Sequence, residues 1–113
     1  MPHIKKELII ANAGSVDTKR FDDLGNYNKI GIHIEATGLS AADGKLVFNG
    51  AVKTKNGHFP LLQGNGDAVE KTVANGHSFF DIMLWHFEHL VIDWVPGANT
   101  GGTVKLYIIA KNY

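Results

Sequence analysis

The residues best suited to metal chemistry lie near the C-terminal quarter of the chain. His86 and His89 are two of six histidines, and cysteine is absent, so any transition-metal site would depend on imidazole and carboxylate ligands. Residues three apart on a strand point to opposite faces of a sheet, and the zincin motif needs histidines four apart. We therefore interpret His86 and His89 as surface or interface residues and expect no metal site.

A second group of oxygen-bearing side chains lies in the N-terminal quarter. Carboxylate and amide oxygens are the ligands that calcium takes. The spacing of this group does not match the EF-hand loop, and such residues are common in turns, where they bond to nearby backbone groups. We interpret them as turn residues, with a loop-bound calcium ion as the alternative. The group consists of Asp17, Asp22, Asp23, Asn26 and Asn28.

The sequence offers no clear catalytic constellation. Ser40 lies in Gly38-Leu-Ser-Ala-Ala42, which lacks the final glycine of the nucleophile elbow. Ser78 follows His77 directly, but catalytic triads are assembled in space and not by sequence adjacency. The absence of cysteine excludes a thiol nucleophile. We expect a protein that is not an enzyme and uses no cofactor.

Aromatic side chains provide another kind of candidate site. Small lectin-like β-sandwiches stack sugars on exposed aromatic rings. Strand alternation places Trp94 in the core, which leaves Trp85 and Tyr107 as the candidates for sugar stacking. Carbohydrate binding is therefore the alternative function that the sequence suggests.

Chain length and net charge limit the number of domains and the kinds of partner that we expect. At 113 residues, the chain is predicted to be one domain, residues 1–113. Lysine plus arginine equals aspartate plus glutamate, 11 of each, so no global field favours nucleic acid or an anionic membrane as a partner. The longest apolar runs are shorter than the roughly 20 residues that a membrane-spanning helix needs. The N-terminus is not followed by the apolar segment that a secretory signal contains, so we expect no secretory signal.

The elements that must position these residues are predicted to be strands. About eight short apolar or alternating segments recur at roughly ten-residue spacing, separated by turns rich in glycine. We expect a single antiparallel β-sandwich of this many strands, jelly-roll-like in topology. Residues 78–85 are almost continuously apolar, which indicates a strand buried on both faces or a short helix. The predicted strands cover residues 5–11, 29–37, 45–53, 58–63, 68–73, 78–85 and two segments within 88–111, and residues 17–24 are expected to be an edge strand or an ordered loop.

The last two segments, around a glycine-rich loop at residues 97–102, read as a long hairpin. Alternation assigns one face of this hairpin to the core. The opposite face keeps Val91, Tyr107 and Ile109 among charged residues, and such a face suits burial against a partner. We predict that these three residues form an interface, with burial under the opposite sheet or a loop as the alternative. The predicted core residues are Leu90, Ile92, Trp94, Val104, Leu106 and Ile108.

With these strands placed, the chain resembles small β-sandwich structural proteins of tailed bacteriophages and related viruses. The resemblance covers residues 30–111 and includes the strand ending at Ala36-Thr-Gly38 and a polar turn at Asn56-Gly57 followed by Phe59. The match is closest at Gly102-Thr-Val104, before the terminal lysine-containing strand. In this chain Asn56 stands where these proteins often have aspartate, and Phe59 where tryptophan is common.

This resemblance implies a structural role in a virus particle. The protein would be a capsid decoration, minor capsid or tail-associated subunit without chemistry of its own. It would assemble in the host cytoplasm into the virion, as a homo-oligomer that contacts a major capsid or tail protein.

Overall fold

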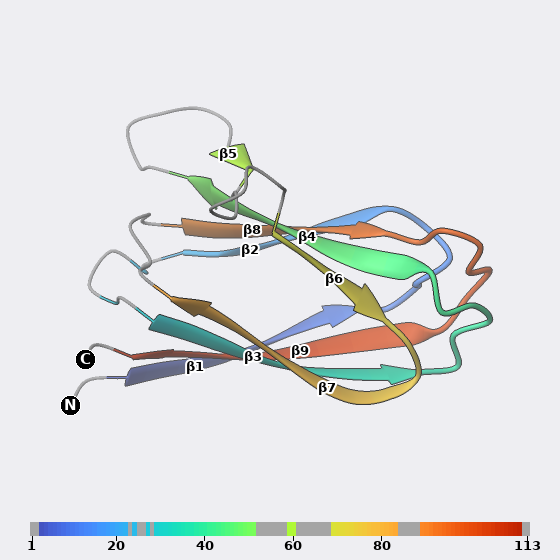
Figure 1. Ribbon diagram of the computed structural model, residues 1–113, viewed down its shortest axis with the longest axis horizontal. Helices are drawn as coiled ribbons and strands as arrows, with labels where there is room; N and C mark the ends of the chain where they lie inside the picture. Colours follow the sequence, from blue (N-terminus) through green and yellow to red (C-terminus); the bar gives the residue numbers. More distant parts are fainter. Residues whose placement is uncertain are drawn as a thin grey trace.

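The computed structural model describes residues 3–22, 24, 27, 29–51, 59–60, 69–83 and 89–111. These residues form strands joined by loops and turns, and Figure 1 shows the strands in two layers. Within the described ranges there is no helix with the length and apolarity needed to cross a membrane. The strands are β1 (His3–Ile10), β2 (Asp17–Phe21), β3 (Lys29–Thr37), β4 (Gly44–Ala51), β5 (Phe59–Pro60), β6 (Glu70–Val73), β7 (Gly76–Met83), β8 (His89–Val95) and β9 (Thr103–Lys111).

Two antiparallel sheets make up the described part of the chain. The four-stranded sheet has the order β1-β9-β3-β7. The five-stranded sheet has the order β2-β8-β4-β5, and β6 also pairs with β4. The loops that join β1 to β2, β3 to β4 and β8 to β9 lie at one end of the molecule, while both chain termini lie at the other (Figure 1).

The strand pairs are nested in the sequence. β1 pairs with β9, β2 with β8, β3 with β7, and β4 with β5 and β6. The chain therefore behaves as one long antiparallel ribbon that folds double and wraps into two facing sheets, which is the jelly-roll arrangement. The prediction of an all-β, jelly-roll-like antiparallel sandwich is confirmed.

The predicted hairpin in residues 88–111 is wrong. β8 belongs to the five-stranded sheet and β9 to the four-stranded sheet, so the loop between them crosses from one layer to the other. Alternation identifies the apolar face of each strand, but it does not decide to which of the two sheets the strand belongs. Here the apolar faces of β8 and β9 oppose each other across the sandwich, and both strands still bury the residues expected.

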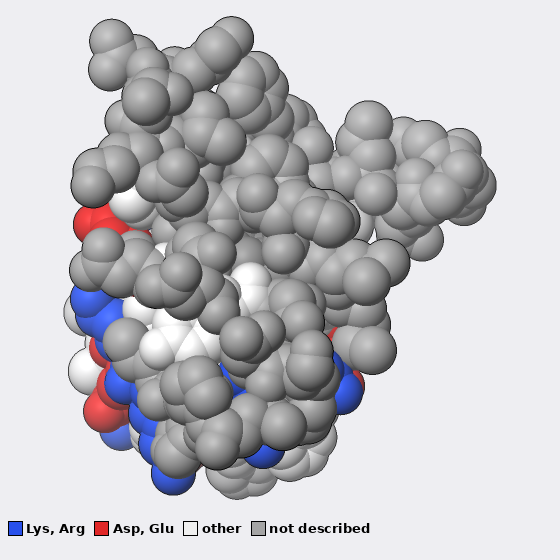
Figure 2. Space-filling view, turned by 90° about the vertical axis from the view of Figure 1, so that its left-hand side faces the viewer, with Lys and Arg blue, Asp and Glu red and all other residues white. Residues whose placement is uncertain are grey.

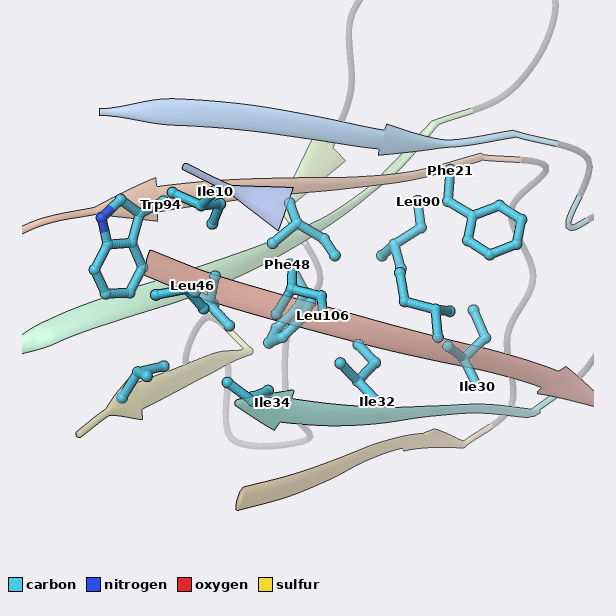
Figure 3. Packing of buried hydrophobic residues seen from close by; sticks show 14 of the residues in the cluster. Ile10, Phe21, Ile30, Ile32, Ile34, Leu46, Phe48, Leu90, Trp94 and Leu106 are labelled. Carbon is cyan, nitrogen blue, oxygen red and sulfur yellow. The ribbon is translucent and has the colours of Figure 1, made fainter. Parts of the chain in front are cut away.

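The core between the sheets contains the six residues that alternation predicted. Leu90, Ile92, Trp94, Val104 and Leu106 are 0% exposed and Ile108 is 1% exposed. Figure 3 shows labelled side chains from both layers, among them Ile32, Leu106 and Phe48, pointing into the space between the sheets. Each fully buried Leu, Ile or Phe side chain contributes about 1.5–3 kcal/mol to folding.

β7 is not the doubly buried strand or short helix that the sequence indicated. In the order of the four-stranded sheet it is the last strand, paired with β3. Ile82 and Phe80 face the core, and Phe80 stacks on Phe48 of the other sheet with ring centroids 4.8 Å apart. Phe79 points the other way and is 72% exposed. The apolar run arises because an exposed phenylalanine interrupts the usual polar outer face.

The loops at one end are joined by side-chain hydrogen bonds. Asn75, in the turn between β6 and β7, accepts a bond from the Leu39 backbone N–H at 2.8 Å and donates to the Leu39 carbonyl at 3.0 Å. Trp94 Nε1 donates to the Ala13 carbonyl at 2.9 Å, which ties β8 to the loop after β1. These contacts connect loops that come from both sheets.

Asn75→Ala should lower the free energy of unfolding by about 1–3 kcal/mol, because both bonds to Leu39 are lost and backbone groups are left without them. The urea midpoint measures the effect. Asn12→Ala is the matched control, since the Asn12 side chain accepts a bond from the Gly14 N–H, which lies in its own loop. A midpoint for Asn75→Ala equal to that of the wild type would contradict this assignment.

Candidate functional site on the outer face of the four-stranded sheet

The outer face of the four-stranded sheet collects side chains from four strands that are distant in the sequence. β3 and β9 both alternate between buried inner residues and half-buried outer residues. The strand register then places Glu7, Tyr107, His33 and Phe79 in one row across β1, β9, β3 and β7. Cross-strand neighbours of this kind have Cβ atoms about 4.5–5.5 Å apart, so their side chains touch.

Four rings from β9, β3 and β7 meet on this face, and we call His33, His77, Phe79 and Tyr107 the ring cluster. The His33 and Phe79 rings are stacked, with centroids 4.6 Å apart and planes 19° apart. The Tyr107 ring lies on the other side of His33 at 5.7 Å. His33 Nε2 and His77 Nδ1 are 2.9 Å apart, which is hydrogen-bond distance. The cluster is thus held by ring stacking and by one imidazole pair.

The ring cluster is unusually accessible for apolar side chains. Phe79, on β7, is 72% exposed, and Ile9 is 43% exposed on β1 at the opposite edge of the same face. Single exposed apolar residues are common, whereas contiguous apolar surfaces mark interaction sites. Tyr107 and Ile109 are half-buried and extend the apolar surface along β9.

A shallow hollow lies next to the ring cluster, where β3 carries a glycine. Its volume is about 180 Å³, and Gly31 and Ile109 line its floor with Asp81, Lys29 and Lys111 around them. A Cβ atom at Gly31 would lie 3.2 Å from Asp81 Oδ1, so any larger residue would fill the space. The hollow therefore combines an apolar wall with charged groups of both signs.

Charges of both signs also surround the ring cluster. Glu35 is the register partner of His77 on one side and of Lys105 on the other. Figure 2 shows the end of the molecule at the left of Figure 1, where the described basic and acidic side chains are interspersed.

Two of the three predicted interface residues lie on this face. Tyr107 and Ile109 are outer residues of β9, as alternation predicted. Val91 contradicts the prediction, because it is only 3% exposed and belongs to β8 of the other sheet, between Arg20 and Asn49 in register. Val91 was grouped with Tyr107 and Ile109 on the assumption that β8 and β9 form a hairpin, which they do not. Because it is buried, Val91 has almost no surface for contact with a partner.

Several other candidate residues lie outside the described residues. These are Trp85, the sugar-stacking candidate, His86, and Asp23, Asn26 and Asn28 of the calcium alternative. Trp94 is buried as expected.

The described acidic residues of the calcium alternative have basic neighbours. Lys19 Nζ lies 3.4 Å from Asp17, and Arg20 Nε donates to Asp22 at 2.7 Å. The Asp22 carboxylate also lies 2.8 Å from His89 Nδ1. The hydrogen bond from Arg20 lowers the pKa of Asp22, with further lowering by nearby positive charges. Among the described residues, no three histidine, aspartate or glutamate side chains are placed to hold a metal ion together.

Sequence reasoning missed three members of the ring cluster, namely His33, His77 and Phe79. The alternation of Ile30, Ile32 and Ile34 already places His33 on the outer face of its strand. Its neighbours could not be found from the sequence, because His33 and His77 are 44 residues apart and meet only through the β3–β7 pairing.

Comparison with known proteins identifies a fold relative. No model of a known protein family matches the chain, and no curated protein sequence matches it. Among solved structures, the crystal structure of the SPBc2 prophage-derived protein YomS matches with a TM-score of 0.63 and 13% sequence identity. The match covers 98% of this chain and 96% of that chain. The two proteins therefore share the fold over nearly their whole lengths.

Proposed function

We propose that the protein is a non-enzymatic structural subunit of a bacteriophage particle, as a capsid decoration, minor capsid or tail-associated protein, and that it assembles through the ring cluster. The observation that carries this proposal is the exposure of Phe79, 72%, where it stacks on His33 on an open sheet face. Jelly rolls occur in viral capsid proteins and in lectins, so the fold is compatible with the role but does not determine it. The shared fold with prophage-derived YomS adds support.

Covering the exposed apolar side chains of this face with a partner is energetically favourable. Removing a phenylalanine side chain from water contributes about 1.5–3 kcal/mol, and aromatic residues are the common anchors of protein interfaces. Lys105 and Glu35, next to the ring cluster, offer a partner one positive and one negative charge with which to form ion pairs. A partner that covers Phe79 would thus gain apolar burial at the centre and charge pairs at the rim.

The occupant that we propose is a second copy of the chain. A two-fold contact presents the same surface from both copies, so basic residues of one copy can face acidic residues of the other. The zero net charge means that two copies do not repel each other over long distances. In the particle, the assembled subunit would contact a major capsid or tail protein, and its location would be the virion.

Replacing Phe79 by aspartate should dissociate the assembly without unfolding the chain. A charge at the centre of the contact should weaken association at least about tenfold, since anchor residues contribute about 2 kcal/mol or more. Tyr107→Asp should act in the same direction. The measurement is the dissociation constant from sedimentation equilibrium, with circular dichroism to check the fold.

Val16→Asp is the matched control for Phe79→Asp. Val16 is 74% exposed, close to the value for Phe79, but it lies in the loop after β1 and not on the sheet face. Equal weakening by Val16→Asp and Phe79→Asp would contradict the assignment of the interface to the ring cluster. Unfolding caused by Tyr107→Asp would contradict its placement on an outer face.

Carbohydrate binding is the second candidate, and the hollow at Gly31 is the observation that favours it. Tyr107 offers a ring for stacking, and Lys29 and Asp81 offer charged partners for sugar hydroxyls nearby. The two functions separate by solution state. A chain that stays monomeric and loses glycan binding on Tyr107→Ala would favour carbohydrate binding over assembly.

A further inference from the structure

The imidazole pair in the ring cluster brings two nitrogens of the kind that bind metal ions next to each other. His33 comes from β3 and His77 from the neighbouring strand β7, and their facing nitrogens, Nε2 and Nδ1, are 2.9 Å apart. His77 is exposed and His33 is half-buried, so an ion in solution can reach the pair. This feature is distinct from His86 and His89, the histidines that the sequence brought to attention.

The distance between the two nitrogens suits coordination. Histidine nitrogens bind zinc at about 2.0–2.1 Å, and two of them on one ion at angles of about 90–110° lie about 2.9–3.4 Å apart. The observed 2.9 Å is at the short end of that range. In the hydrogen bond the two nitrogens face each other directly, with the ring centroids 5.1 Å apart, so each ring would also have to turn for both lone pairs to point at one ion.

Metal binding changes where the protons of the two rings lie. In the hydrogen-bonded pair, one facing nitrogen carries the proton and the other accepts it. A metal ion needs both lone pairs, so His33 would carry its proton on Nδ1 and His77 on Nε2. For two neutral rings this change is a shift of tautomer with no net loss of protons.

The surroundings hold the ligands in place. The His33 ring lies between Phe79, stacked at 4.6 Å, and Tyr107 at 5.7 Å, which restricts its rotation. Both histidines sit on paired strands, and ligands on regular elements are better positioned than ligands on loops. Glu35, the register partner of His77, adds a negative charge near the pair, while Lys105 lies beyond Glu35.

We propose that His33 Nε2 and His77 Nδ1 together bind one divalent transition metal ion of the class that prefers imidazole, such as Zn²⁺, Ni²⁺ or Cu²⁺. Since the described residues provide no group of three such ligands, the remaining positions belong to water or to groups from outside the chain. Both ligands come from one chain, so the site does not require the proposed assembly. Its open positions point out from the face that we propose as a contact.

Calorimetric titration of the full chain, without an affinity tag, with Ni²⁺ and Zn²⁺ at neutral pH tests the proposal. We expect one ion per chain, and a rise of at least about tenfold in the dissociation constant for His33→Gln and for His77→Gln. The metal should also raise the melting temperature of the wild type but not of the double variant, because only a folded site binds it. His3→Gln, at the start of β1, is the control and should bind like the wild type.

Two results would overturn the metal site. One is the absence of binding at millimolar ion. The other is binding that survives both substitutions, which would assign the ion to other histidines. Circular dichroism of each variant separates lost binding from lost folding. A monomer that binds the ion would support the metal site even where the assembly proposal fails.

Discussion

Ile92→Asp is expected to prevent the chain from folding. Ile92 is 0% exposed in the middle of β8, and its register partners are Lys19 on one side and Phe48 on the other. An unpaired carboxyl group in an apolar core costs several kcal/mol even when it takes up a proton, and this adds to the lost burial of the isoleucine, against the roughly 5–15 kcal/mol by which most domains are stable. The variant should lose the far-ultraviolet circular dichroism of a β-protein and show no cooperative urea transition.

The control for this substitution lies on the same strand. Val95 is 38% exposed at the end of β8, so Val95→Asp places the same charge in contact with water. Val95→Asp should fold with a urea midpoint near that of the wild type. A cooperative transition for Ile92→Asp at the wild-type midpoint would show that the face of β8 has been assigned incorrectly.

Trp94→Ala should have the second largest effect, a loss of about 3–5 kcal/mol of stability from the cavity that it leaves. Trp94 is 0% exposed and fits against the backbone of β4, where a Cβ atom on Gly44 would lie 2.4 Å from its ring. Its indole N–H also donates to the Ala13 carbonyl at 2.9 Å. The tryptophan thus joins β8, β4 and the loop after β1.

Trp94→Phe separates the two contributions of this residue. Phenylalanine keeps an aromatic ring in the cavity but removes the donor, so the Ala13 carbonyl loses its partner at a cost of about 1–3 kcal/mol. We expect urea midpoints in the order wild type, Trp94→Phe, Trp94→Ala. A Trp94→Ala variant as stable as the wild type would contradict the packing described here.

Local patterns in the sequence predicted which residues are buried, because alternation along a strand is independent of its partners. Ile30, Ile32 and Ile34 alternate with Gly31 and His33, and the structure buries only the isoleucines of this run. The exposure of Phe79 could not be predicted in this way. In a continuous apolar run, nothing distinguishes the residue that faces solvent from the one that faces the core.

The partners of each strand could not be predicted in the same way. A strand with one apolar face can bury that face from a position in either sheet. The sequence pattern of β8 and β9 therefore indicated a hairpin, although the two strands lie in different layers. Val91 was grouped with Tyr107 for this reason. The ring cluster escaped notice for the complementary reason, since His33 and His77 become neighbours only through pairing between strands far apart in the chain.

The solution mass measured by light scattering over a concentration series tests the central claim most directly. For the wild type, we expect a mass that rises with concentration to a multiple of 12.3 kDa, and for Phe79→Asp a mass that stays at the monomer value. That pair of results would assign self-association to the ring cluster. A wild type that remains at 12.3 kDa at every concentration would contradict it.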